Sequence, residues 1–503
     1  MKGIMIQGTG SDVGKSLIAT AVCRAFSNEG VRTAPFKSQN MSNNSYVTID
    51  GKEIGRAQGI QAEAARTEAT VWMNPILLKP RSDSQSEVVL LGRAEQTLSG
   101  RGYRNSFYER GLETIREALH QLENNYEVIV MEGAGSPVEI NLKDRELVNM
   151  KVAEMADVPV VLVADIDRGG VFASIVGTLE LFEPKERARV KGLIINKFRG
   201  DISLFEDGIE WLEQKTGIPV LGVLPYMDNH MIDGEDSLSI PQSHRSNEAG
   251  LIDIAVFKAP YISNYSDIEP FYYEEDVSIR WVSTLAEIGS PDAVILPGTK
   301  STIRDLMYFK DAGLTDWLKS YAETGGYIAG ICGGYQMLGE HLIDHEGSDT
   351  GVPFTEEKGI GLIPGTTTFA KEKKTVRAEG VIHQGTGLNQ VPVSGYEIHL
   401  GETVFGEKSL PFLQLNGHKE GYCGNDGRLI GTYLHHLFHN DEWRNLWLNR
   451  LREAKGVPMR ETLHNSRIKD EKYDELAAHM LKHLDWEKLK LIIEQWSTHN
   501  EVV

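Results

Sequence analysis

Cysteine is scarce in this chain of 503 residues, which contains only Cys23, Cys332 and Cys423. Three cysteines cannot form a disulfide framework in a chain of this length, and none stands at a zinc-ligand spacing. Long apolar runs are also lacking, because no stretch of about 18 apolar residues occurs and the N-terminus has no apolar core with a cleavage site. These absences exclude a disulfide-rich scaffold and a membrane-spanning segment, and they predict a cytoplasmic protein.

Positive charge is in deficit. The chain has 52 Lys and Arg against 72 Asp and Glu, a formal net charge of -20 at pH 7. Such a surface repels phosphate polymers and anionic lipid unless a local basic patch intervenes, so nucleic acid and membrane are not expected as partners. The acidity serves solubility equally well.

Short apolar runs alternate with helical patterns in two sets. The runs occur at 4–6, 128–131, 158–163, 193–195 and 220–224, and then at 252–256, 293–296 and 327–329. Continuous apolar strands are typical of parallel sheets covered by helices on both faces, with the chemistry at the carboxyl ends of the strands. The sequence therefore predicts two doubly wound α/β domains.

The composition of the chain predicts where the domains begin and end. A polar, turn-rich stretch at 233–250 is typical of a linker, so we expect domains at 1–232 and 251–455 and a helical tail at 456–503. In this tail one helical face carries apolar residues, which favours packing against a domain. These residues are Leu476, Ala477, Met480 and Leu484.

A glycine-rich segment follows the first expected strand. Residues 8–16 read Gly-Thr-Gly-Ser-Asp-Val-Gly-Lys-Ser and lead into a helical pattern. In a strand, glycine loop and helix of this kind, backbone N–H groups and the positive helix end bind phosphate oxygens, the lysine reaches the terminal phosphates and the hydroxyl can bind Mg²⁺. The predicted ATP-binding residues are Gly8, Thr9, Gly14, Lys15 and Ser16.

Polar side chains stand at the ends of further expected strands. Glu132 is a second candidate for Mg²⁺, because a carboxylate is a hard oxygen ligand. Asp165 and Asp167 could be either functional or structural. Asn196 and Lys197 follow another strand and are typical of a base-recognition element, so we add them to the ATP-binding candidates.

Lys37 stands where the second strand of the first set should end. It could neutralise a transferring phosphate or bind a carboxylate substrate. Gln39 and Asn40 follow closely and are uncharged, which favours a functional lysine over a merely solvated one. These three residues are the candidates for binding substrate or phosphate.

Cys332 lies in Gly-Ile-Cys-Gly-Gly, between an expected strand and an expected helix. Glycines permit the strained turn of a nucleophile elbow, where the helix N-terminus lowers the thiol pKa and N–H groups can bind an oxyanion. Cys332 is therefore the expected nucleophile, and Gly333 contributes to the expected oxyanion site. Cys23 and Cys423 lack this setting and are expected to be structural.

A cysteine nucleophile needs a base. His435, after the strand-like residues 429–432, is the better candidate, and its neighbour His436 is an alternative. The segment that ends the preceding strand at 293–296 offers a second oxyanion donor from its backbone near Gly298 and Thr299.

With these residues in place, the chain resembles the cobyric acid synthase family nearly from end to end. Its N-terminal half is similar to dethiobiotin-synthetase-like P-loop ATPases, and its C-terminal half to class I, triad-type glutamine amidotransferases. The segments that point to this family are 35–42, 53–58, 73–80, 132–137, 139–142, 165–172 and 395–399.

The resemblance implies ATP- and glutamine-dependent amidation of the b, d, e and g carboxylates of adenosylcobyrinic acid a,c-diamide, giving adenosylcobyric acid. It implies ATP with Mg²⁺ as the substrate complex and no tightly bound prosthetic group. Each carboxylate would become an acyl phosphate, which ammonia released from glutamine by Cys332 and His435 would attack.

Two positions depart from the family pattern. His436 stands where a glycine is usual, and Leu437 stands where triad amidotransferases place an acid. The resemblance therefore implies a Cys/His dyad, and the sequence does not decide whether Glu397 or His399 orients His435. Two alternatives remain: a cobyrinic acid a,c-diamide synthase, and a P-loop regulatory ATPase with a non-catalytic amidotransferase scaffold.

Overall fold

The computed structural model describes residues 1–82, 85–99, 107–227, 250–406 and 409–499. Contacts divide the chain into two compact units. The first comprises Met1–Ser243 together with Arg467–Val503, and the second is His244–Ser466. The predicted linker at 233–250 lies almost wholly outside the described residues, so the predicted boundaries stay predictions. None of the described helices is long and apolar enough to cross a membrane.

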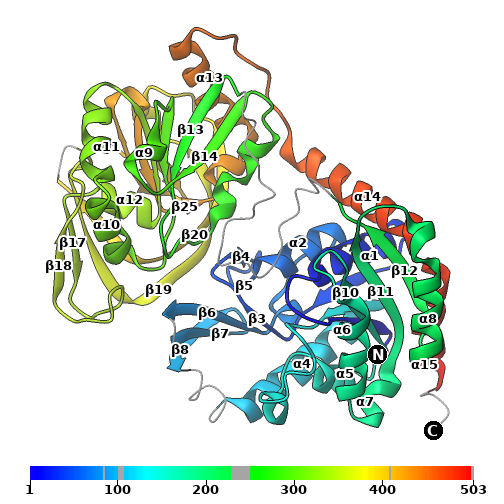
Figure 1. The fold of residues 1–503 in the computed structure, drawn as a ribbon. Coiled ribbons are helices and arrows are strands. Elements are labelled where there is room, and N and C mark those ends of the chain that lie inside the picture. Colours follow the sequence, from blue (N-terminus) through cyan, green and yellow to red (C-terminus); the bar gives the residue numbers. More distant parts are fainter. Residues whose placement is uncertain (83–84, 100–106, 228–249, 407–408, 500–503) are drawn as a thin grey trace. The chain divides into compact units, whose positions relative to one another are not determined.

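A six-stranded parallel sheet forms the centre of the first unit (Figure 1). Its strand order is β12-β11-β10-β1-β9-β2, so the carboxyl ends of β1, β9 and β10 are adjacent. The strands are β1 Gly3–Gly8, β2 Thr33–Phe36, β9 Val128–Glu132, β10 Val160–Asp165, β11 Val190–Phe198 and β12 Val220–Pro225. Because these strands are almost wholly buried on both faces, the predicted parallel α/β sheet is confirmed.

Helices cover both faces of this sheet. Residues of α4 Tyr108–Asn125, α5 Met150–Ala156, α6 Val171–Leu181 and α8 Glu206–Thr216 pack into one core. The short helix α7 is Pro184–Arg189. The opposite core holds α1 Lys15–Asn28, α2 Arg56–Ala64, α14 Asn465–His483 and α15 Trp486–His499. Leu476, Met480 and Leu484 are buried in this second core, which confirms the predicted packing face of the tail.

Smaller elements complete the first unit. The four-stranded sheet β3-β6-β7-β8 consists of β3 Gln39–Met41, β6 Ile76–Ser82, β7 Gln85–Leu90 and β8 Arg93–Ser99. A two-stranded ribbon pairs β4 Ser45–Val47 with β5 Glu53–Gly55. The short 3-10 helices are η1 Val71–Met73, η2 Lys143–Arg145 and η3 Ile202–Phe205.

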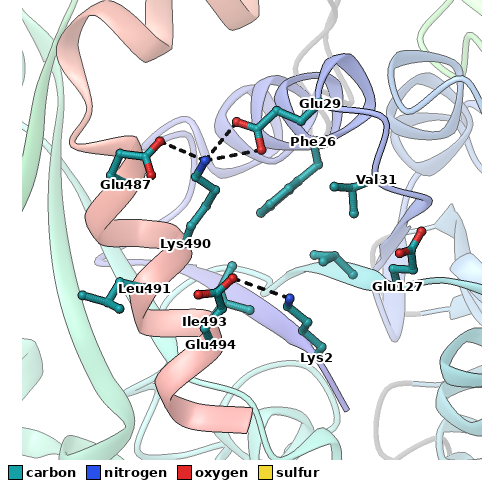
Figure 2. A pocket seen from close by; sticks show the side chains of 11 residues that line it. Lys2, Phe26, Glu29, Val31, Glu127, Glu487, Lys490, Leu491, Ile493 and Glu494 are labelled. Atoms are coloured by element: carbon teal, nitrogen blue, oxygen red, sulfur yellow. Dashed lines mark hydrogen bonds and ion pairs between the residues drawn. The ribbon is translucent and has the colours of Figure 1, made fainter. Parts of the chain in front are cut away.

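A cavity of about 520 Å³ lies between α15 and the ends of α1 and β9 (Figure 2). It is bordered by Lys2 and Val128, which are at the amino ends of β1 and β9, so it lies at the sheet edge opposite the phosphate loop. The Lys490 ammonium bridges Glu29 and Glu487 at 3.1 and 2.9 Å. The pair with Glu29 attaches the C-terminal helix to the end of α1, whereas the pair with Glu487 lies within α15.

The second unit is also built on a six-stranded sheet, in the order β14-β13-β15-β16-β24-β23. Its strands are β13 Ile252–Phe257, β14 Val277–Val282, β15 Ala293–Leu296, β16 Tyr327–Ile331, β23 Tyr422–Gly424 and β24 Leu429–Thr432. Only the edge pair β23–β24 is antiparallel. Its helices are α9 Leu285–Ile288, α10 Thr302–Asp311, α11 Leu314–Glu323, α12 Gly333–Leu338 and α13 Asp441–Lys455.

A second, largely antiparallel sheet adds a long ribbon that the sequence did not predict. Its strands are β17 His341–Asp344, β18 Thr355–Lys358, β19 Gly365–Ile382, β20 Pro392–Phe405, β21 Leu413–Leu415, β22 His418–Glu420 and β25 Leu434–His435. The 3-10 helices are η4 Tyr265–Tyr273, η5 Gln384–Thr386, η6 Asn425–Gly427 and η7 Leu437–His439. Strand β20 pairs with β25, which brings the ribbon to His435.

Candidate active sites

The glycine-rich loop connects β1 to α1, as predicted. Gly14 is the N-cap of α1 and has a φ of 99°, a conformation that L side chains rarely adopt. A Cβ at Gly14 would also lie 2.1 Å from the side-chain nitrogen of Asn196. The Thr9 N–H donates to the Val163 carbonyl at 2.9 Å. The loop therefore needs glycine at position 14 and is held against β10.

Lys15 folds over this loop. Its ammonium donates to the carbonyls of Gly10 at 2.9 Å and Gly135 at 3.3 Å, and its side chain is largely buried. Gly135 belongs to the segment that follows β9, so Lys15 joins the loop after β1 to the loop after the neighbouring strand. This is where phosphate oxygens would meet the ammonium.

Glu132 is the centre of a buried polar cluster. Ser16 Oγ donates to its Oε1 at 2.7 Å, Gln61 Nε2 donates to its Oε2 at 2.8 Å, and the Lys37 ammonium lies 3.6 Å from Oε1. Glu132 and Lys37 are each about 1% exposed. One carboxylate and one hydroxyl fit Mg²⁺, since this ion binds few protein oxygens and completes its shell with phosphates and water. Gln61 is a member of this cluster that the sequence analysis missed.

Asn196 and Lys197 support the loop from β11. The Asn196 amide donates to the Val13 carbonyl at 2.8 Å. The Lys197 ammonium lies 2.9 Å from an Asp165 oxygen and donates to the Asp12 carbonyl. The structure thus brings both residues to the phosphate loop, while recognition of a base stays a prediction.

The remaining candidates of the first unit have other partners or positions. Asp167 is ion-paired with Arg199 at 2.9 Å. Asn40 is buried on β3, where its amide donates to Gln58 Oε1 of α2 at 3.1 Å. Gln39 lies on the same short strand and is partly buried.

Cys332 occupies the turn between β16 and α12, with a φ of 51° and a ψ of −110°. Its N–H donates to the Thr432 carbonyl at 2.8 Å, and its Sγ lies 3.5 Å from the Ile398 carbonyl oxygen. A Cβ at Gly334 would lie 2.1 Å from the Leu296 carbonyl oxygen. The strained turn and the crowded glycine have the geometry predicted for a nucleophile elbow.

His435 is completely buried and is held by Asp267. Its Nδ1 lies 2.7 Å from Asp267 Oδ2, and the other carboxylate oxygen accepts the N–H of His436 at 2.7 Å. Burial lowers the pKa of His435, but the charges of Asp267 and Cys332 and the hydrogen bonds to both residues outweigh burial and raise it to about 10. The buried imidazole thus faces an acid on one side and a thiol on the other.

Asp267 of η4, and neither Glu397 nor His399, holds His435, so the structure adds an acid to the implied Cys/His dyad. Glu397 instead pairs with Lys374, and His399 contacts the Gly401 carbonyl. Asp267 was missed because 168 residues separate it from His435. The only hint in the sequence that a distant acid contacts His435 was the lack of an acid at position 437.

His436 is a poorer candidate for the base. It has a φ of 64°, and its ring stacks on His439 with centroids 4.1 Å apart. Asp267 accepts its backbone N–H. The geometry therefore favours His435.

The predicted oxyanion residues lie beside the cysteine and the histidine. A Cβ at Gly298 would lie 3.0 Å from His435 Cε1, and one at Gly333 would lie 3.0 Å from the Thr299 nitrogen. The Ser263 N–H donates to the Gly298 carbonyl at 2.9 Å. Backbone nitrogens of both segments are thus available near Cys332.

Asp305 ties the loop at 298–301 to the segment before η4. Its carboxylate accepts the Thr299 hydroxyl and lies 3.3 Å from the Tyr261 nitrogen. Burial raises the pKa of Asp305 to about 7. A largely buried acid therefore stabilises the arrangement of the two segments that flank His435.

Both halves of the chain are similar to known proteins. The model of the CobQ/CobB/MinD/ParA nucleotide binding domain matches residues 4–238, and that of the CobB/CobQ-like glutamine amidotransferase domain matches 253–443. The chain is 50% identical to the cobyric acid synthase of Geobacillus thermodenitrificans over 98% of both chains, and 48% identical to that of Desulforamulus reducens over 97% of both. The PurLQS structure from Thermotoga maritima matches 46% of this chain and 99% of its own, at a TM-score of 0.29 and 13% identity.

The two folds and their sites define an ATP-dependent, amide-forming ligase with a glutamine amidotransferase domain. Among such ligases, the chain belongs to the cobyric acid synthase family. Membership implies a corrinoid substrate and glutamine as the source of nitrogen. A regulatory ATPase with a non-catalytic amidotransferase scaffold is therefore not supported.

Proposed function

We propose that this chain amidates the b, d, e and g carboxylates of adenosylcobyrinic acid a,c-diamide in steps, forming adenosylcobyric acid. Each amide would consume one ATP and one glutamine. The observation that carries this proposal is the 50% identity to a cobyric acid synthase over 98% of both chains. Because ATP and glutamine are cytoplasmic metabolites, we propose the cytoplasm as the place of the reaction.

In the first unit, the substrate carboxylate attacks the γ-phosphorus of ATP, and ADP leaves as an acyl phosphate forms. The Lys15 ammonium lies against the loop and the Lys37 ammonium lies beside Glu132. Both can therefore attract the negative charge of the transferred phosphoryl group. Mg²⁺ held by Ser16 and Glu132 would neutralise phosphate charge. Gln61 keeps Glu132 oriented.

Further residues of this unit are proposed for binding. The loop backbone around Gly8 and Gly14 holds the phosphates, Thr9 anchors this loop to β10 through its N–H, and Asn196 and Lys197 keep it in place. We assign Gln39 and Asn40 to the corrinoid substrate, because their strand begins two residues after Lys37.

In the second unit, Cys332 attacks the side-chain carbonyl carbon of glutamine. Backbone N–H groups near Gly298 and Gly333 stabilise the resulting oxyanion. His435, held by Asp267, passes a proton to the departing nitrogen, so ammonia leaves and a thioester remains. Water then hydrolyses the thioester to glutamate. The ammonia attacks the acyl phosphate, and an amide and inorganic phosphate form.

Mass spectrometry of the corrinoid product tests the proposal. With adenosylcobyrinic acid a,c-diamide, ATP, Mg²⁺ and glutamine, we expect four amides to be added. Two amides added to cobyrinic acid, with no reaction of the a,c-diamide, would instead identify a cobyrinic acid a,c-diamide synthase.

A further inference from the structure

One ring nitrogen of His399 is buried without a hydrogen-bond partner in the part of the chain that the structure describes. Its other nitrogen, Nδ1, lies 2.6 Å from the Gly401 carbonyl oxygen. Because a carbonyl only accepts, Nδ1 carries the proton and Nε2 is left as an acceptor. Burial is the main cause that lowers the pKa of His399 to about 4, so the ring is neutral at neutral pH.

His399 lies close to the cysteine. Its ring stacks on Tyr433, with centroids 3.8 Å apart and planes 13° apart. The residues that precede the two rings both contact the cysteine. The carbonyl oxygen of Ile398 lies 3.5 Å from Cys332 Sγ, and the carbonyl of Thr432 accepts the Cys332 N–H. The neutral acceptor is thus held between two chain segments that both contact Cys332.

An acidic and a basic side chain lie beside His399. Glu397 is two residues before His399 on β20, so both side chains leave the same face of the strand. Glu397 is 5% exposed and ion-paired with Lys374, which is the register partner of His399 on β19. An acid, a base and a neutral acceptor match the α-ammonium and α-carboxylate of a free amino acid.

We propose that His399 Nε2, with Glu397 beside it, accepts hydrogen bonds from the α-ammonium group of glutamine, and that Lys374 attracts its α-carboxylate. This assignment rests on the proposed function, in which Cys332 attacks the side-chain carboxamide. The carboxamide oxygen then faces the loops at Gly298 and Gly333, and the carboxamide nitrogen leaves toward His435. The α-ammonium is the remaining donor of the substrate.

Glutaminase kinetics test the proposal. For His399→Ala, we expect KM for L-glutamine to rise about ten- to a hundredfold, since a hydrogen bond to a charged group is lost, while kcat changes little. His399→Gln keeps an acceptor oxygen and should recover part of the affinity. The matched control is His383→Ala, because the one described hydrogen bond of the His383 ring is the bond that it accepts from the Gly385 N–H. It should leave KM unchanged.

A substrate without the α-ammonium supplies the second readout. Glutaramate lacks this group, so the wild type and His399→Ala should hydrolyse it with equal kcat/KM. In the wild type alone, we expect glutamine to be preferred over glutaramate by about tenfold or more. If the wild type hydrolysed both substrates with equal kcat/KM, the proposal would be contradicted even where the alanine variant does not fold.

Two results would overturn the proposal: an unchanged KM for glutamine in His399→Ala, or an equal loss of kcat/KM on glutaramate. A wild-type protein that hydrolyses no glutamine would instead contradict the proposed function. Ammonia-dependent amidation should be the same in all variants, since it does not use the glutamine site.

Discussion

The Nδ1 atom of His435 lies 2.7 Å from the Oδ2 atom of Asp267, and both side chains are completely buried. A buried carboxylate in this position fixes the imidazole tautomer and stabilises its charged form. The acid that triad amidotransferases place at the position of Leu437 is thus supplied here by η4. The first prediction concerns this pair.

Asp267→Asn should lower kcat for glutamine hydrolysis by about 10³-fold or more, because the amide no longer stabilises the imidazolium. Ammonia-dependent amidation should persist. Glu275→Gln is the matched control, since this nearby acid has a side chain that is 88% exposed. A rate within threefold of the wild type in Asp267→Asn would show that the carboxylate does not serve His435.

Cys332→Ala should abolish glutamine-dependent amidation and leave ammonia-dependent amidation intact, because only the first route needs a thiolate. Cys423→Ala removes another buried thiol of the same unit and should leave both activities. Corrinoid amide formation with each nitrogen source is the measurement. Undiminished glutamine-dependent activity in Cys332→Ala would place the nucleophile elsewhere.

Lys15→Ala should abolish amidation with either nitrogen source, because the ammonium that meets the phosphates is gone. Lys2→Ala is a suitable control, since Lys2 precedes β1 at the opposite sheet edge and its side chain is 45% exposed. Release of ADP and inorganic phosphate can be followed with ammonia as the nitrogen source. Full activity in Lys15→Ala would contradict the phosphate-loop assignment.

Gly14→Ala should weaken ATP binding and lower stability, because the new methyl group would meet the Asn196 amide at 2.1 Å and the backbone has a φ of 99°. A residue forced into this region costs roughly 1–3 kcal/mol. Gly177→Ala is the control, since a Cβ there meets nothing within 4 Å and Gly177 lies within a helix. Equal Kd values for ATP in all three proteins would argue against close packing at the loop.

Asp305 should make stability depend on pH. Burial raises the pKa of its carboxyl to about 7 in the folded protein, against about 4 in an unfolded chain. The protonated form is thus favoured by folding, and this stabilisation is complete below about pH 4 and lost as pH rises through about 7.

Asp305→Asn does not titrate. The free energy of unfolding of the wild type should therefore fall relative to that of Asp305→Asn between about pH 4 and 7, by at most about 1.4 kcal/mol per pH unit. Urea unfolding at several pH values measures this difference. Parallel pH profiles would show that Asp305 is not the titrating group.

Short stretches of sequence were enough to predict the two glycine-rich turns of the proposed sites. The glycines at 8–16 and around Cys332 permit tight turns, and a tight turn depends mainly on the residues within it. Strand, turn and helix were therefore predicted correctly at both places. The chemistry was also predicted to lie at the carboxyl ends of the strands, where polar residues follow them. Parallel strands bring their carboxyl ends to one edge, where Ser16 and Lys37 meet Glu132.

Other partners were decided only by the tertiary structure. Asp267 reaches His435 across 168 residues, Gln61 reaches Glu132 across 71, and β20 lies beside Cys332 because it pairs with β25. Each of these contacts depends on the order of strands and the path of a connecting segment, and no local pattern encodes either. The sequence alone thus determined the two glycine-rich turns, at 8–16 and around Cys332, whereas packing between distant segments decided which acid holds the histidine.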